Sequence, residues 1–171
     1  MPKPAQYSGS TMGNLPIGQG LSVTPIQMAT AYAAIANGGI LRKPRLVERA
    51  GGKRIPEAHG RRILTASDAA KLRKMLEGVL APGGTASEVS VPGYTLAGKT
   101  GTAQKVVNGT YSDTEFVASF VGFAPATDPK LLVAIVADDP SVGSYYGGTV
   151  AAPAFGEIAK FALPYLGIAP N

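Results

Sequence analysis

The segment Ala97-Gly98-Lys99-Thr100-Gly101-Thr102-Ala103-Gln104 (AGKTGTAQ) decides the fold, because it fits two incompatible structures. With Gly93 upstream it completes the phosphate-loop pattern G-x-x-x-x-G-K-[ST], in which a helix begins at the Lys-Thr pair. The eleven residues from Lys99 to Gly109 contain two glycines and four β-branched residues, and both kinds disfavour a helix. The sequence therefore predicts a strand here, and a P-loop nucleotide-binding protein stays only as a remote alternative.

A β-hairpin through residues 95–123 is predicted around Asn108-Gly109, a pair typical of two-residue turns between antiparallel strands. Leu131–Ala137 is predicted to be a third, buried strand, and Asp138 and Asp139 follow it. Two carboxylates at a strand end can hold a metal, but a turn beside Pro140 explains them without one. We therefore predict neither a metal site nor a cofactor.

Three helices are predicted around this sheet. The first begins at the capping sequence Thr24-Pro25-Ile26-Gln27 and ends before Gly38-Gly39. Its predicted buried side holds Ile26, Ala29, Ala33 and either Ala36 or Ile35. The second helix is predicted over residues 66–80 and the third over residues 150–166. Residues 1–23 are predicted to be mostly loop, and residues 40–64 to be short edge strands or an extended excursion. Together these elements predict an α/β (α+β) fold, an antiparallel sheet flanked by helices.

The composition indicates one globular domain. At 171 residues and 45% hydrophobic, residues 1–171 suffice for a single core. No cysteine is present, which excludes disulfides and thiolate metal sites within these residues. The longest apolar run, Leu131–Ala137, is far short of the roughly 18–20 residues that span a bilayer, and the first residues do not resemble a signal peptide.

Positive charge is concentrated between residues 42 and 74. Eleven Lys and Arg stand there against three acidic residues, +8 in a chain whose net charge is +5. A solvated linker and helix face is the favoured interpretation, and contact with an anionic membrane or cell-wall polymer is the alternative. The region contains no aromatic residue to stack on a base, so nucleic acid is not a predicted partner.

Several motifs, in the same order, resemble those of the class B (monofunctional) penicillin-binding proteins, over residues 14–168. The motifs are Ile17-Gly18-Gln19-Gly20 with Thr24-Pro25-Ile26-Gln27 and Ala36-Asn37-Gly38-Gly39, the Lys99-Thr100-Gly101 strand, Phe120-Val121-Gly122-Phe123, Tyr145-Tyr146-Gly147-Gly148, and Ala152-Pro153-Ala154-Phe155. The resemblance implies part of a transpeptidase fold of the kind shared with serine β-lactamases.

The resemblance also implies roles for individual residues. In that family a serine attacks the carbonyl of a wall stem peptide or of a β-lactam and forms an acyl-enzyme. Lys99 would supply positive charge near this serine, and the hydroxyls of Thr100 and Thr102 would bind the substrate carboxylate. The Thr102 N–H would donate to the oxyanion. Gly101 would let the ligand approach the strand closely, and Tyr145 and Tyr146 would either contact substrate or cap the core.

The chain departs from the family in one respect: it lacks both serine motifs. None of its ten serines has Lys three positions on or Asn two positions on. We therefore expect a C-terminal half of a transpeptidase domain, without its nucleophile and inactive alone. The missing N-terminal half of the domain is its expected partner, beside a stem peptide or β-lactam. An uncovered strand edge then predicts self-association.

Two other interpretations stay open beside the transpeptidase. One is a catalytically inactive module that binds peptidoglycan or a protein partner, and the other is a serine β-lactamase, which the Gly18-Gln19-Gly20 region disfavours. The family resemblance places the parent protein on the extracytoplasmic side of a bacterial membrane, anchored by an N-terminal segment that precedes these residues.

Overall fold

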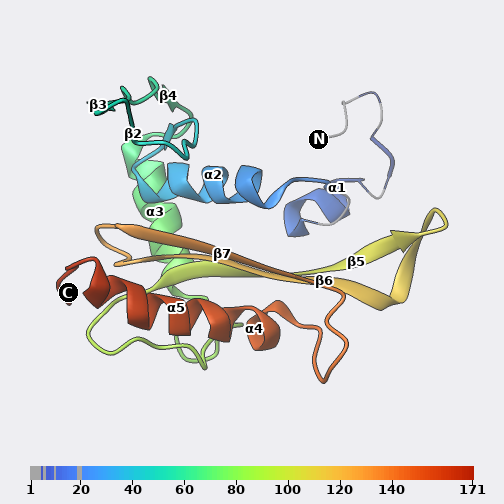
Figure 1. The fold of residues 1–171 in the computed structure, drawn as a ribbon. Coiled ribbons are helices and arrows are strands. Elements are labelled where there is room, and N and C mark those ends of the chain that lie inside the picture. The colour runs from blue at the N-terminus through green and yellow to red at the C-terminus, as the bar shows by residue number, and fades with distance from the viewer. Residues whose placement is uncertain (1–4, 6, 10, 19–20) are drawn as a thin grey trace.

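A three-stranded antiparallel sheet separates two helical layers (Figure 1). The computed structural model describes residues 5, 7–9, 11–18 and 21–171. Helix α2 (Pro25–Ala36) lies over one face of the sheet, and α4 (Gly147–Val150) and α5 (Ala152–Tyr165) lie over the other. Helix α3 (Ala66–Glu77) runs past one end of the sheet. The predicted fold, an antiparallel sheet flanked by helices, is confirmed.

The sheet is built from the predicted hairpin. Strands β5 (Ala97–Val107), β6 (Thr110–Ala124) and β7 (Leu131–Asp138) pair in the order β5-β6-β7. Asn108 and Gly109 form the turn with positive φ angles of 52° and 84°, the backbone of a type I′ hairpin turn. The hairpin and its turn are therefore as the sequence predicted.

The predicted full burial of the third strand is wrong. Every residue of β7 is at least partly accessible, and Val136 keeps 44% of its surface exposed. The reason is position, since β7 lies at the edge of the sheet and pairs only with β6. An apolar run identifies a strand, but burial depends on its neighbours in the sheet.

The main core lies between the sheet and α5. Phe120 of β6 and Phe155 of α5 are fully buried, and their ring centroids are 4.9 Å apart. The predicted helix over residues 150–166 begins earlier, at Gly147, and is divided by Ala151 into α4 and α5. Ala151 and Ala152 are fully buried, because only small side chains fit where the two helices meet the sheet.

Helix α2 begins as predicted but does not bury the predicted residues. The Thr24 hydroxyl accepts from the Gln27 N–H, and the Gln27 side chain accepts from the Thr24 N–H, the reciprocal capping box. The helix ends before Gly38, whose φ is 82°. Ala34 is its one buried residue, whereas Ile26 is 55% exposed, so the predicted buried side is wrong at Ile26.

The prediction that residues 1–23 are mostly loop is wrong for one segment. A short helix α1 (Thr11–Asn14) continues into the 3₁₀ helix η2 (Leu15–Ile17). A turn at Ser8 begins this helix: the Thr11 N–H donates to the Ser8 carbonyl, and the Thr11 hydroxyl accepts from the Ser8 N–H. The segment has no apolar periodicity from which a helix could have been predicted. Gln19 and Gly20 of the Gly-Gln-Gly motif lie outside the described residues.

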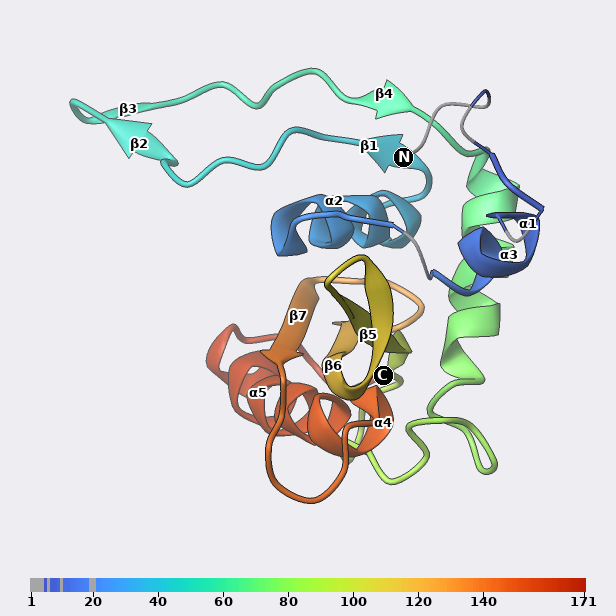
Figure 2. The same ribbon diagram turned by 90° about the vertical axis from the view of Figure 1, so that its right-hand side faces the viewer.

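An extended two-stranded arm leaves the body between α2 and α3 (Figure 2). Strands β1 (Ile40–Leu41) and β4 (Arg61–Arg62) pair at its base, and β2 (Arg49–Ala50) and β3 (Lys53–Arg54) pair at its tip. Every residue from position 42 to position 63 is exposed. The predicted short strands in an extended excursion are confirmed. No helix among the described residues is long and apolar enough to cross a lipid bilayer.

Candidate functional site

The Lys-Thr-Gly segment lies in the first half of β5, an edge strand of the sheet. Lys99 pairs with Val121 and Gly101 pairs with Ser119, so the chain is extended on both sides of the lysine. A phosphate loop needs a helix N-terminus at this point, and the strand excludes it. The prediction of a strand is confirmed, and the nucleotide-binding alternative fails on the geometry.

The two faces of β5 carry different groups, as the alternation of a strand requires. Thr100 pairs with Phe120, whose side chain packs on α5, so the even-numbered residues belong to the α5 side. Lys99 and Gly101 belong to the other face, which α2 covers, but because β5 is an edge strand Thr100 and Thr102 also line the same cavity. The lysine is therefore aimed into the space between the sheet and α2.

A cavity of about 620 Å³ occupies that space. Its walls come from three parts of the chain: residues of β5–β7, residues of α2 such as Met28 and Tyr32, and the segment that leads from η2 into α2. Among the described residues that line it, Lys99 is the only charged one. Burial of Tyr32 raises the pKa of its phenol, so the hydroxyl stays neutral at physiological pH. The cavity is thus an apolar and hydroxyl-lined groove with one positive charge.

Lys99 has no carboxylate partner. Its Nζ donates to the Thr100 carbonyl oxygen at 2.9 Å and lies 3.4 Å from the Thr100 Oγ1. None of the ion pairs among the described residues includes Lys99. Its side chain is exposed, and since an ammonium has three donors, the one that Thr100 takes at 2.9 Å leaves others for an anionic ligand.

The two threonine hydroxyls are held by neighbours that sequence reasoning did not single out. The Thr100 Oγ1 lies 2.8 Å from the Thr85 Oγ1, and the Thr102 Oγ1 accepts from the Gly147 N–H at 3.1 Å. A hydroxyl that accepts one hydrogen bond can still donate its own proton. Thr102 is exposed, so its O–H can point to a ligand while Gly147 holds its oxygen.

Gly147 can make this hydrogen bond only because it has no side chain. A Cβ at Gly147 would overlap the carbonyl oxygens of Gly101 and Ser119, and a Cβ at Gly148 would overlap the Thr85 carbonyl oxygen. The start of α4 therefore lies directly on β5 and on the loop before it. The paired glycines after two tyrosines are the sequence signal from which this close approach could have been predicted.

Tyr145 and Tyr146 form an aromatic cluster with Phe116 beside the strand. The Tyr145 ring stacks on Phe116 with centroids 4.1 Å apart, and the Tyr146 ring lies 4.5 Å from Tyr145. The pKa of Tyr145 is raised, chiefly because its hydroxyl donates to the Tyr146 hydroxyl at 3.3 Å. Tyr146 keeps 58% of its surface exposed, and its contact with substrate stays a prediction.

The other polar candidates do not join this site. Asp138 forms an ion pair with Lys105 at 3.0 Å, and His59 lies exposed on the arm. The described residues contain no group of three or more His, Cys, Asp or Glu that could hold a metal.

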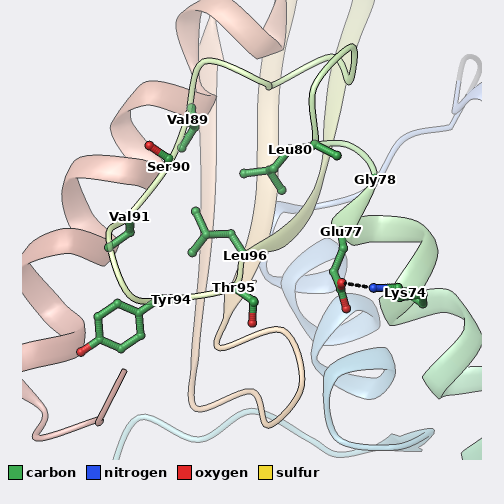
Figure 3. A pocket seen from close by; sticks show the side chains of 11 residues that line it. Lys74, Glu77, Gly78, Leu80, Val89, Ser90, Val91, Tyr94, Thr95 and Leu96 are labelled. Carbon is green, nitrogen blue, oxygen red and sulfur yellow. Dashed lines mark hydrogen bonds and ion pairs between the residues drawn. The ribbon is translucent and has the colours of Figure 1, made fainter. Parts of the chain in front are cut away.

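A second cavity, of about 470 Å³, lies between the end of α3 and residues 78–96 (Figure 3). Its charged residues, Lys74 and Glu77, neutralise each other at 2.7 Å, so it offers no free charge. The groove with Lys99 is the candidate functional site.

Comparisons with known proteins agree with this assignment. A family model described as the penicillin binding protein transpeptidase domain matches residues 1–160. The probable peptidoglycan D,D-transpeptidase PenA of Neisseria gonorrhoeae is 42% identical over 154 residues, which cover 90% of this chain and 26% of that protein. The peptidoglycan D,D-transpeptidase FtsI of Escherichia coli K12 is 36% identical over 171 residues, which cover 99% and 28%. The chain thus spans about a quarter of the length of these relatives.

Solved structures show the same similarity. The apo form of penicillin binding protein 3 from Mycobacterium tuberculosis superposes with a TM-score of 0.88 at 37% identity, covering all of this chain and 42% of that one. The same protein complexed with ampicillin gives 0.88 at 36% identity, and complexed with aztreonam 0.87 at 36%, each covering all of this chain and 41% of that one. Sequence, fold and groove together establish that the chain belongs to the penicillin-binding protein transpeptidase domain family and forms part of such a domain.

Proposed function

We propose that this chain is the carboxylate-binding part of a peptidoglycan D,D-transpeptidase, which also binds β-lactams. The observation that carries the proposal is the ammonium of Lys99, which forms no ion pair and is the only charge among the groove-lining residues that the structure describes. Stem peptides that end in D-Ala and β-lactams both present a carboxylate next to the carbonyl that reacts. A fixed cation in such a groove binds that carboxylate and orients the carbonyl beside it.

The threonines complete the anion site. Gly147 donates to Thr102, which leaves the Thr102 proton for the ligand, and Thr85 as donor leaves the Thr100 proton in the same way. The Thr102 N–H contributes to the oxyanion hole, where a donor placed against developing charge lowers the barrier. Gly101 has no side chain between the ligand and the strand. Tyr145 and Tyr146, whose ring centroids are 4.5 Å apart, are proposed to contact the ligand beside the strand.

The attacking serine belongs to polypeptide other than these 171 residues, because no serine here stands in an S-x-x-K or S-x-N motif. In the complete domain its oxygen bonds to the carbonyl carbon, the peptide bond to the terminal D-Ala breaks, and the released amine takes a proton. An acceptor amine from a second strand then displaces the serine. The positive charge of Lys99 stabilises the negative charge on the attacking serine oxygen. It also attracts the carboxylate of the bound substrate. The parent protein acts outside the cytoplasm, anchored to the membrane by an N-terminal segment.

A domain-exchange experiment tests the proposal. Residues 1–160 replace the corresponding segment of Escherichia coli FtsI, a relative whose match covers 99% of this chain. We expect the exchanged protein to be labelled by fluorescent penicillin, and Lys99→Met to abolish labelling while the melting temperature stays unchanged. The 171-residue chain alone is expected to give no covalent band. Covalent labelling of the isolated chain would place a nucleophile inside these residues and refute the proposal.

A further inference from the structure

The arm between Arg42 and Arg62 is the most strongly charged surface of the chain. It contains eight Lys and Arg and two Glu, a net charge of 8 − 2 = +6, whereas the whole chain has a net charge of +5. The remaining residues together carry 5 − 6 = −1. The net positive charge of the protein is therefore that of the arm, since the other eight Lys and Arg are balanced by acidic residues elsewhere.

The arm has no part in the folded core. All of its residues are exposed, and Figure 2 shows it extending away from α2 and α3. Its pairing is limited to two residue pairs at the base and two at the tip. Isolated two-stranded hairpins are marginally stable and bury little apolar surface, so stability of the core does not explain this element. Its ten residues from Arg42 to Gly51 reach about 30 Å in extended form.

The charges of the arm are only partly neutralised from within. Glu57 is shared by Arg42, Arg45 and Arg54 at 3.5–3.8 Å, and Arg54 also contacts Glu48. These pairs bridge the two sides of the arm and keep it extended. Lys43, Lys53 and Arg61 form no ion pair among the described residues. Cations thus remain free from base to tip.

We propose that this arm docks on the carboxylates of peptidoglycan strands, outside the groove that holds Lys99. The inference rests on the proposed function, which makes a polymer with repeated stem-peptide carboxylates the substrate. Cations spread over an extended arm match charges repeated along a polymer, and Arg binds carboxylates in a two-pronged geometry. The arm would hold the polymer near the site and raise the local substrate concentration.

The tip of the arm argues against insertion into a lipid bilayer. It consists of Arg49, Ala50, Gly51, Gly52, Lys53 and Arg54, and none of these is a large apolar side chain. Interfacial membrane anchors need apolar side chains beside their basic ones. The exposed apolar residues of the arm, Leu46, Val47 and Ile55, lie outside this tip, and lipid vesicles are therefore included in the test below. The arm contains no aromatic residue either, so it recognises charge and not the faces of sugar rings.

A sedimentation assay with insoluble sacculi tests the proposal. The 171-residue chain is mixed with purified sacculi whose stem-peptide carboxylates are free, and with the same sacculi after carbodiimide amidation. The test variant is Lys43→Gln/Lys53→Gln/Arg61→Gln, and the matched control is Lys71→Gln/Lys130→Gln/Lys160→Gln. Both lower the net charge of +5 by three at exposed positions. Circular dichroism checks that each variant keeps the parent fold.

The arm variant is expected to bind free-carboxylate sacculi roughly tenfold more weakly, since each of three exposed pairs contributes about a factor of two. The control variant is expected to bind free-carboxylate sacculi as the parent chain does. Amidated sacculi are expected to bind neither the parent chain nor the control variant. Equal losses in both variants, undiminished binding to amidated sacculi, or no sedimentation of the parent would overturn the proposal. So would arm-dependent binding to anionic lipid vesicles without binding to sacculi. Lys99→Gln is expected to sediment normally, which separates docking from the groove.

Discussion

Replacing Gly147 with alanine tests how the fold holds the candidate site together. The φ of Gly147 does not require glycine, so alanine is permitted by the backbone and the effect is steric. The new methyl group would overlap two backbone carbonyl oxygens, those of Gly101 and Ser119. Backbone atoms in paired strands cannot rotate aside as a side chain does. Either α4 moves away from the sheet, or β5 and β6 distort.

The size of the effect follows from this contact. Overpacking of a tight site costs about 1–3 kcal/mol, and we take about 2 kcal/mol because both contacts are backbone. For a chain of this length, about 2 kcal/mol lowers the melting temperature by roughly 4–8 °C. The displacement of α4 also removes the hydrogen bond from the Gly147 N–H to the Thr102 Oγ1. Stability and geometry of the anion site are therefore expected to change together.

Thermal unfolding of the chain followed by circular dichroism measures the first effect. The matched control is Gly13→Ala, because a Cβ at Gly13 has no heavy atom within 4 Å and the residue lies in a helix. We expect this control to melt between the parent value and about 4 °C above it, because alanine favours a helix over glycine by up to about 1 kcal/mol. If Gly147→Ala melts within the same range, α4 does not lie on β5 as described, and the explanation of how Thr102 is oriented is refuted.

Three further predictions concern the core, the charges and the open edge. Phe155→Ala is expected to destabilise the chain by about 3–5 kcal/mol in urea unfolding, and Phe161→Ala, whose ring is 70% exposed, by less than about 0.5 kcal/mol; equal losses would contradict the described core. The hydrogen bond to Asp138 raises the pKa of Lys105 above 10.5, so its stabilisation is fully present below that pH and lost as pH rises through the raised value. The stability difference between the parent and Lys105→Met is therefore expected to shrink as the pH rises above about 10.5, and a difference independent of pH would exclude the ion pair. The free edge of β7 predicts self-association that Val136→Lys weakens, measured by sedimentation velocity, and a parent monomeric at all concentrations would refute it.

Local signals in the sequence predicted the ends of the elements well. The capping box at Thr24 and Gln27 and the turn at Asn108-Gly109 depend on contacts within three residues, and both form as predicted. Burial was predicted poorly, since Ile26 is 55% exposed and Val136 faces a groove that the described chain does not fill. Hydrophobic pattern identifies the face of an element, but the neighbours that cover that face can be far away in sequence or on other polypeptide.

The register of the hairpin shows a second limit. A two-residue turn at Asn108-Gly109, continued regularly, would pair Gly101 with Phe116, but Gly101 pairs with Ser119. The shift occurs between Gln104 and Val106, opposite a turn in which the Ser112 hydroxyl accepts from two backbone N–H groups, those of residues 114 and 115. The side-chain turn absorbs three residues of β6. Without it, the face of the sheet below Lys99 would be different.

The two faces of the sheet explain why the site is open in this chain. On the α5 side Phe120 and Phe155 are completely buried, whereas on the α2 side Met28 and Val136 remain 36% and 44% exposed around the groove. At 4 Å, an ion pair is worth about 1 kcal/mol in water and about 4 kcal/mol at the effective dielectric of a partly covered site. Covering the groove therefore strengthens the attraction of Lys99 for a carboxylate several-fold. We infer that the polypeptide which supplies the serine also supplies the low dielectric, so that completion of the fold and activation of the anion site are one event.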